Sequence, residues 1–290
     1  MIAKNFIEAH LPRIEETLAQ LLNFPSCPQN KLFEAARYSV LGGGKRWRPL
    51  IAIATASAFG CPLEKILTPA CAIELIHCYS LIHDDLPCMD DDDFRRGKPS
   101  LHKKYDEAIA VLTGDFLLTY AFEVLSKTTT LSDKQKLRFI ETLSKRSGGD
   151  GMVAGQLLDI EAEKSSTTKE EQTYLHLKKT AELIACSFEF GAIAAEASDQ
   201  TVGQLYRIGL DLGLAFQIQD DILDVTESVA KHGKKVSSDL TNEKSTFVSL
   251  YGIDLAKTKT HELKTRSQMN LNTLPLNSSL LTEFTEMILP

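Results

Sequence analysis

The sequence predicts an all-α protein, a single large bundle of about ten or more helices around a central cavity. Apolar residues recur at three- and four-residue steps along most of the 290 residues, alternating strand patterns are scarce, and no Asn-Gly hairpin signature occurs. Glycine and proline mark short breaks at residues 25–28, 42–44, 60–62, 97–99 and 147–151. Because no repeat or linker marks a boundary, we expect one domain over residues 1–290.

Individual helices can be predicted from these patterns. Apolar side chains place a first amphipathic helix over residues 7–21, and the almost wholly apolar segment 69–83 predicts a buried helix. Thr168 and Glu171 have the spacing of a capping box, which opens a helical run to about residue 196. The helical pattern resumes from Val202 to Val225.

Composition excludes several classes of protein. The net charge of −7 disfavours a nucleic-acid-binding surface. Six cysteines form no C-x-x-C pair, so we expect reduced thiols rather than a disulfide framework. The N-terminus has no signal-peptide pattern, and no apolar run reaches the roughly 18 residues of a membrane span. We expect a cytoplasmic protein without stable membrane insertion.

Two clusters of aspartates are the most informative features. Asp220 and Asp224 lie four residues apart on one helix face, with Gln217 one turn earlier, between apolar stretches. The other cluster holds six aspartates within ten residues. Its members Asp84 and Asp90 would point about 240° apart on an unbroken helix, so a metal site there requires the helix to end or kink at Pro87.

Side chains of this kind bind hard cations, because carboxylate oxygens without His or Cys favour Mg²⁺ or Mn²⁺. One acidic run alone is more often a solvated loop or a helix cap. Two runs that both leave apolar helices favour a metal site, in which the two helices face one shared cavity.

Basic residues with phosphate-binding character accompany the acids. The glycine-rich turn at residues 42–44 runs through Lys45, Arg46 and Arg48 into a helix, where backbone N–H groups and cations can hold an anion. A basic surface turn is an equally good interpretation of this segment. Arg95 and Arg96 either neutralise the preceding acids or bind phosphate oxygens. His77 lies two turns before Asp84 on the same face, where it is either a ligand or a core histidine.

At these residues the chain resembles a known family, the short-chain trans-prenyltransferases, and within it the bacterial-type farnesyl diphosphate synthases. Seven blocks match in the family's order between about residues 35 and 250. They are LGGGKRWRP, ELIHCYSLIHDDLPCMDDDDFRRGKPSLH, VLTGDFLL, GMVAGQLLDI, LKKTAELI, GLAFQIQDDILDV and GKKVSSDLTNEKST.

The resemblance implies a role for each matching residue, within a polyprenyl synthetase domain that forms a homodimer. Metal ligands for three Mg²⁺ ions would be Asp84, Asp90 and Asp220, with Asp85, Asp221 and Asp224 in support. The allylic diphosphate would be held by Arg95, Lys179, Lys234 and Lys244. Isopentenyl diphosphate would be held by Lys45, Arg48, His77 and Arg96. The reacting carbons would face Lys179, Thr180 and Gln217.

The implied reaction condenses isopentenyl diphosphate with dimethylallyl or geranyl diphosphate to give farnesyl diphosphate. Tyr79 lies five residues before Asp84, about 7.5 Å along a helix, where an aromatic ring would limit the product to fifteen carbons. In this family the inserted pair Pro87-Cys88 goes with the same product length.

Three alternatives remain. A geranylgeranyl diphosphate synthase would have a deeper pocket, which Tyr79 disfavours. A terpene cyclase would replace Asp220 and Asp221 by an Asn/Ser/Glu-type motif. A non-catalytic helical partner subunit would be expected to lose motif residues, and here they are all present.

Overall fold

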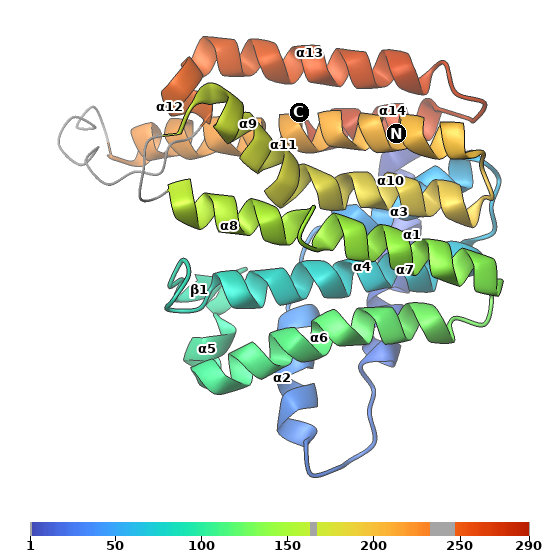
Figure 1. Cartoon of the computed structure of the whole chain (residues 1–290), viewed down its shortest axis with the longest axis vertical. Coiled ribbons are helices and arrows are strands. Elements are labelled where there is room, and N and C mark those ends of the chain that lie inside the picture. Colours follow the sequence, from blue (N-terminus) through green and yellow to red (C-terminus); the bar gives the residue numbers. More distant parts are fainter. Residues whose placement is uncertain (1, 163–166, 233–246, 290) are drawn as a thin grey trace. The chain divides into compact units, whose positions relative to one another are not determined.

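A computed structural model of the chain describes residues 2–162, 167–232 and 247–289. These residues form α-helices, one π-helical turn and one two-stranded hairpin, so the predicted all-α fold is confirmed. The backbone divides into two compact units, residues 1–143 with 190–197 and residues 144–189 with 198–290. Figure 1 traces the helices of each unit along the chain.

The first unit is built around α4. Its elements are α1 (Ile2–Leu21), α2 (Asn30–Val40), α3 (Trp47–Ala58), α4 (Leu63–Asp84), β1 (Phe94–Arg95), β2 (Lys98–Pro99), α5 (Leu101–Lys104), α6 (Glu107–Lys127) and most of α7 (Asp133–Ser147). The helix α4 packs mainly against α6 and α3, and α4 and α6 run side by side (Figure 1). Apolar side chains such as Ile66, Ile73 and Leu75 are fully buried and account for the position of α4 in the core.

The second unit is built around α11. It contains α8 (Met152–Ala162), α9 (Lys169–His176), η1 (Leu177–Ala181), the first part of α10 (Glu182–Ala194), α11 (Asp199–His232), α12 (Phe247–Tyr251), α13 (Ile253–Leu271) and α14 (Ser279–Ile288). The helix α11 packs against α13 along its length and against η1 (Figure 1). Leu205, Leu212 and Ile218 supply its buried face.

Local sequence explains where helices begin and end. The capping box of Thr168 and Glu171 is present, with both reciprocal hydrogen bonds formed. The side chain of Asp106 accepts the backbone N–H of Ile109 and caps α6. The structure differs from the expectation at Pro69, because α4 begins six residues earlier, at Leu63, and includes this proline. It also differs after residue 176, where one π-helical turn interrupts the expected α-helical run.

Two described helices are long and apolar enough to cross a membrane, α4 and α6. In α4, 72% of the apolar window is buried, as is usual for the core helix of a soluble protein, whereas in α6 the buried share is 39%. One or two such helices are weak evidence for a membrane protein.

Candidate active site

The first aspartate cluster lies on a chain reversal at the end of α4. The helix ends at Asp84, three residues before Pro87, and the backbone N–H of Asp90 donates to the backbone carbonyl of Asp84 over 2.9 Å. The N–H of Asp91 donates to the carbonyl of Leu86 over 3.1 Å, and Asp91 has a left-handed φ of 50°. The helix end that the metal hypothesis requires is therefore present, and it brings the backbones of Asp84 and Asp90 together.

Arg95 of the hairpin and Lys103 of α5 (Leu101–Lys104) pair with Asp85, Asp91, Asp92 and Asp93. Arg95 donates from Nε over 2.8 Å and from Nη2 over 2.5 Å to one oxygen of Asp85, and from Nη2 over 2.6 Å to Asp92. Lys103 lies 2.9 Å from Asp93 and 3.5 Å from Asp91. Burial raises the pKa of Asp85, and the hydrogen bond from Arg95 opposes that shift. In this structure Arg95 thus neutralises acids, the first of its two expected roles.

A second group of basic side chains surrounds His77. Burial, and then the positive charges of Arg48, Arg96 and Arg46, hold the pKa of His77 well below its usual value of 6.5. Burial also lowers the pKa of Arg48, although the charge of Glu74 opposes the shift. The Nε of Arg48 is buried and has no hydrogen-bond partner within the described part of the chain. A neutral imidazole beside arginines, one with an unused donor, fits an anionic group.

Arg96 is fixed in this group by the glycine-rich turn. Its Nη1 donates to the carbonyl of Gly43. A Cβ on Gly44 would lie 2.8 Å from Cζ of Arg96, and Gly44 has φ of +134°. Only glycine can therefore occupy position 44 with the guanidinium in this place. Lys45, the next residue, is exposed.

Arg46 has a role that the sequence did not reveal. It is 2% exposed, has a left-handed φ of 52°, and pairs with Glu74 over 2.7 Å and with Glu15 over 2.7 Å. Its Nη2 also donates to the carbonyl of Val40 over 2.6 Å. Arg46 therefore anchors the basic turn and is not available to a ligand. Glu74, an acid within the mostly apolar helix α4, indicates that a buried cation lies nearby but does not identify Arg46 as that cation.

An open pocket lies in the first unit beside the hairpin. Arg95, Arg96 and Lys98 line it, together with apolar side chains of α4 that include Leu81 and Ile82. Of the residues expected to bind substrate, this pocket includes the two hairpin arginines.

Tyr79 is buried, with 5% of its surface exposed. Its ring meets that of His83 edge to face at 5.8 Å. Burial, and then the charge of Asp84, raise the pKa of Tyr79 to about 12. The hydroxyl therefore stays protonated near the acidic end of α4.

In the second unit, the expected reacting-site residues lie on η1 and α11. Lys179 and Thr180 belong to the π-helical turn, a rare element that is frequent at functional sites. Nζ of Lys179 donates to Asp159 over 2.7 Å. The hydroxyl of Thr180 donates to Gln217 over 2.8 Å, so the structure brings these two predicted residues together.

The second aspartate cluster divides into one buried and two accessible acids. Asp221 is 7% exposed and accepts hydrogen bonds from the Gln217 amide over 3.1 Å and from the Phe247 backbone over 2.9 Å. Nε2 of His176 lies 3.4 Å from the Asp221 oxygen that accepts from Phe247. Asp220 is half-buried and Asp224 is exposed. The other two predicted diphosphate ligands, Lys234 and Lys244, lie outside the described residues.

Donor chemistry at both clusters fits a hard cation, because carboxylate oxygens predominate. Within residues 2–162, 167–232 and 247–289, no three His, Cys, Asp or Glu side chains are arranged to hold a metal ion by themselves. Asp84 and Asp90 lie in the first unit and Asp220 lies in the second.

Comparisons with known proteins place this all-α chain among the isoprenyl diphosphate synthases. It is 37% identical to the crystal structure of a geranyltransferase from Helicobacter pylori complexed with magnesium and isoprenyl diphosphate, with a TM-score of 0.85 over 98% of this chain and 95% of that one. Residues 29–273 match the family model described as polyprenyl synthetase, and this chain belongs to that family.

Characterised relatives of this chain include synthases of two product lengths. The chain is 45% identical to the farnesyl diphosphate synthase of Micrococcus luteus over 92% of both proteins. It is 42% identical to the chloroplastic geranylgeranyl pyrophosphate synthase of Catharanthus roseus over 83% of this chain and 68% of that protein. The family expectation from sequence is confirmed, and the similarity to the farnesyl enzyme extends over more of both chains.

Proposed function

We propose that this protein condenses isopentenyl diphosphate with dimethylallyl or geranyl diphosphate to form farnesyl diphosphate. In each cycle the allylic C–O bond breaks, a C–C bond forms to isopentenyl diphosphate, and a proton is lost to the departing diphosphate. The observation that carries this proposal is the basic group around His77, in which the buried Nε of Arg48 has no protein partner in the described residues. A phosphate oxygen is a suitable acceptor for that donor.

Binding of isopentenyl diphosphate is assigned to Lys45, Arg48, His77 and Arg96. Because the imidazole of His77 is neutral, it can donate one hydrogen bond without adding charge. Arg48 and Arg96 supply the positive charge, and their planar forks suit phosphate oxygens. Glu74 limits the mutual repulsion of these arginines, since it lies 3.9 Å from Arg96 and pairs with Arg46.

The allylic substrate is assigned to the aspartate clusters and the remaining basic residues. Asp84, Asp90 and Asp220 would hold magnesium, three ions by family analogy, and Mn²⁺ has the same ligand preference. Magnesium, when bound, offsets the negative charge that develops on the departing diphosphate. Arg95, Lys179, Lys234 and Lys244 would contact the same diphosphate.

Stabilisation of the allylic cation is assigned to oxygen dipoles of the second unit. The hydroxyl of Thr180 and the amide of Gln217 are already oriented by their mutual hydrogen bond. Preorganised dipoles cost no reorganisation when charge develops. The backbone carbonyl of Lys179 is assigned to the same task.

The direct test is incubation with isopentenyl and geranyl diphosphates, with and without Mg²⁺, followed by extraction and chromatography of the products. A fifteen-carbon product that requires the metal supports the proposal. A twenty-carbon main product would indicate a geranylgeranyl diphosphate synthase. Absence of any metal-dependent prenyl product would indicate a non-catalytic partner subunit.

We further propose a homodimer that works in the cytoplasm. The helix α6 is long and apolar enough to cross a membrane, yet only 39% of its apolar stretch is buried. Val111 and Leu112 are 40% and 55% exposed on it. Sedimentation velocity should give a dimer for the natural protein and a smaller species for Leu112→Glu, because a charge in an apolar interface is costly. A monomeric natural protein would refute this assignment.

A further inference from the structure

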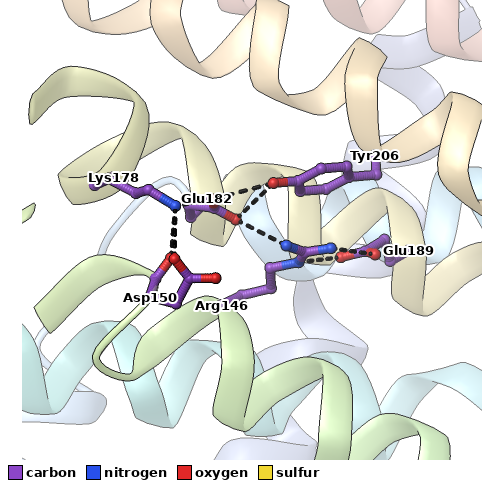
Figure 2. A network of polar contacts seen from close by, with 6 residues as sticks. All are labelled: Arg146, Asp150, Lys178, Glu182, Glu189 and Tyr206. Carbon is purple, nitrogen blue, oxygen red and sulfur yellow. Dashed lines mark hydrogen bonds and ion pairs between the residues drawn. The ribbon is translucent and has the colours of Figure 1, made fainter. Parts of the chain in front are cut away.

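Six polar residues of the second unit form a connected network that includes Lys178 of the π-helical turn and Glu182, the residue after it. They come from the end of α7, the following loop, η1, α10 and α11, and Figure 2 shows their contacts. The members are Arg146, Asp150, Lys178, Glu182, Glu189 and Tyr206. None of them is among the residues assigned above to substrate or metal.

Arg146 is the centre of this network. Its Nε and Nη2 donate to the two oxygens of Glu189 over 2.8 and 2.9 Å, and its Nη1 donates to Glu182 over 3.3 Å. The ring of Tyr206 lies 3.7 Å from its Cζ. Burial alone would lower the pKa of Arg146, but its hydrogen bond to Glu189 and the surrounding negative charge raise that pKa. The guanidinium is therefore a permanent charge that orders two acids and one ring.

Glu182 links the network to the backbone of the turn. Its backbone N–H donates to the carbonyl of Leu177, the hydrogen bond that closes the π-helical turn. Its side chain is 3% exposed and accepts from the Tyr206 hydroxyl over 3.1 and 3.2 Å and from Lys178 over 3.1 Å. The residue that ends the turn is thus held by three donors, counting Arg146.

Lys178 is itself a residue of the π-helical turn and connects it to the preceding loop. Its Nζ donates to the carbonyl of Asp150 over 2.7 Å as well as to Glu182. The next two residues point elsewhere, since Lys179 pairs with Asp159 and Thr180 bonds Gln217. The network therefore holds Lys178 before and Glu182 after the segment that contains Lys179 and Thr180, the residues assigned to the reacting carbons.

The π-helix is rare and occurs mostly as single turns within α-helices, so contacts around this turn are expected to hold it in place. Backbones also approach it closely. A Cβ on Gly155 would lie 2.1 Å from the backbone N of Lys179, and one on Gly213 would lie 2.5 Å from Cα of Ala181.

We propose that Arg146, Glu182 and Tyr206 are positioning residues for prenyl transfer, which hold the π-helical turn so that Lys179 and Thr180 present their oxygens to the reacting carbons. This inference rests on the proposed function. It differs from a purely stabilising role, because loss of the network should alter the chemical step and leave binding of isopentenyl diphosphate intact.

Tyr206→Phe is the sharpest test, since it removes one hydroxyl and retains the ring against Arg146. We expect kcat to fall about tenfold, the loss of a hydrogen bond to a buried charge, while the KM for isopentenyl diphosphate changes less than about twofold. Hydrogen exchange at the Glu182 amide should become faster, because that N–H closes the turn. Arg146→Gln should have a larger effect, and Arg146→Lys should restore part of kcat.

The matched control is Arg266→Gln. Arg266 also makes a two-point contact within the second unit, to Asp211 over 2.7 and 2.6 Å, but this pair joins α13 to α11 and Arg266 is exposed. It should leave kcat and exchange at Glu182 unchanged.

Two results would overturn the proposal: unchanged kcat in Tyr206→Phe, or an equal loss of melting temperature and activity in Tyr206→Phe and Arg266→Gln. Should the natural protein make no prenyl product, the proposed function fails. Exchange at the Glu182 amide then still decides whether the network holds the turn.

Discussion

The backbone N–H of Asp90 donates to the backbone carbonyl of Asp84 over 2.9 Å. This hydrogen bond joins two residues that an unbroken helix would separate by about 240° of rotation. It closes the reversal around Pro87-Cys88, so that the first acid ends a buried helix and the second lies on an exposed loop. An insertion in this loop can therefore adjust the spacing of the two proposed metal ligands without changing the helix.

Asp90, a proposed magnesium ligand, and Asp93 should respond differently to neutralisation. We expect Asp90→Asn to lower kcat roughly 10²- to 10³-fold and to raise the Mg²⁺ concentration needed for half-maximal rate, the scale of losing one preorganised electrostatic contact. Asp93→Asn is the control, because Asp93 pairs with Lys103 at 2.9 Å. Initial rates across a magnesium titration measure both. Equal effects of the two substitutions would contradict the assignment of Asp90 as a ligand.

Neighbouring glycines of the basic turn provide a second comparison. Gly43 and Gly44 both have positive φ, but only at Gly44 would an added Cβ meet the guanidinium of Arg96. We expect Gly44→Ala to raise the KM for isopentenyl diphosphate about tenfold or more, the scale of one displaced charged hydrogen bond. Gly43→Ala shares the backbone strain without the clash, so its KM should rise much less. Matching increases would show that strain, and not displacement of Arg96, determines binding.

Much of the fold could be predicted because local signals agree with it. The capping box at Thr168 and the breaks at glycine and proline act within a few residues, so the sequence alone places them. The helix end before Pro87 follows in the same way, from the missing donor and ring of proline.

Features that depend on distant partners could not be predicted. No local pattern distinguishes a π-helical turn at Leu177–Ala181 from an α-helix, since the extra residue is accommodated by packing of Gly155 and Gly213. The burial of Arg46 requires Glu15 and Glu74, residues on two other helices. From the sequence alone, Arg95 could bind phosphate or pair with a neighbouring acid. The structure shows its hydrogen bond to Asp85.

Tyr79 should control product length. We expect Tyr79→Ala to extend the main product beyond fifteen carbons, because removal of the ring opens space along α4, and to cost roughly 3 kcal/mol of stability as a buried cavity. Tyr79→Phe keeps the ring and should keep the fifteen-carbon product. Chromatography of dephosphorylated products measures both variants. An unchanged product distribution in Tyr79→Ala would remove this residue from chain-length control.

His77 should make stability fall in weak acid. Its pKa in the folded protein lies well below the value near 6.5 expected after unfolding, so the unfolded chain binds the extra proton. Stability is then fully present above about pH 6.5 and decreases as the pH falls toward the folded pKa, by up to about 1.4 kcal/mol for each pH unit. Thermal melts of His77→Asn between pH 7 and 5 should show a smaller decrease than the natural protein. If melting temperature fell equally with pH in both proteins between pH 7 and 5, this role of His77 would be refuted. Between pH 7 and 8 the melting temperatures of the two proteins should change in parallel.

Gly155 should be needed for both the stability and the geometry of the π-helical turn. Its substitution by alanine would place a Cβ 2.1 Å from the backbone N of Lys179, where backbone must move. We expect Gly155→Ala to lose roughly 1–3 kcal/mol through overpacking and to lower kcat, with little change in the KM for isopentenyl diphosphate. Gly203→Ala in α11 is the control, because an added Cβ there meets nothing within 4 Å. It should stabilise the protein by up to about 1 kcal/mol through helix propensity and leave kcat unchanged. A fall in kcat in both variants would mean that activity follows general changes in helix packing. A fall in kcat confined to Gly155→Ala would show that activity depends on the close approach of α8 to Lys179.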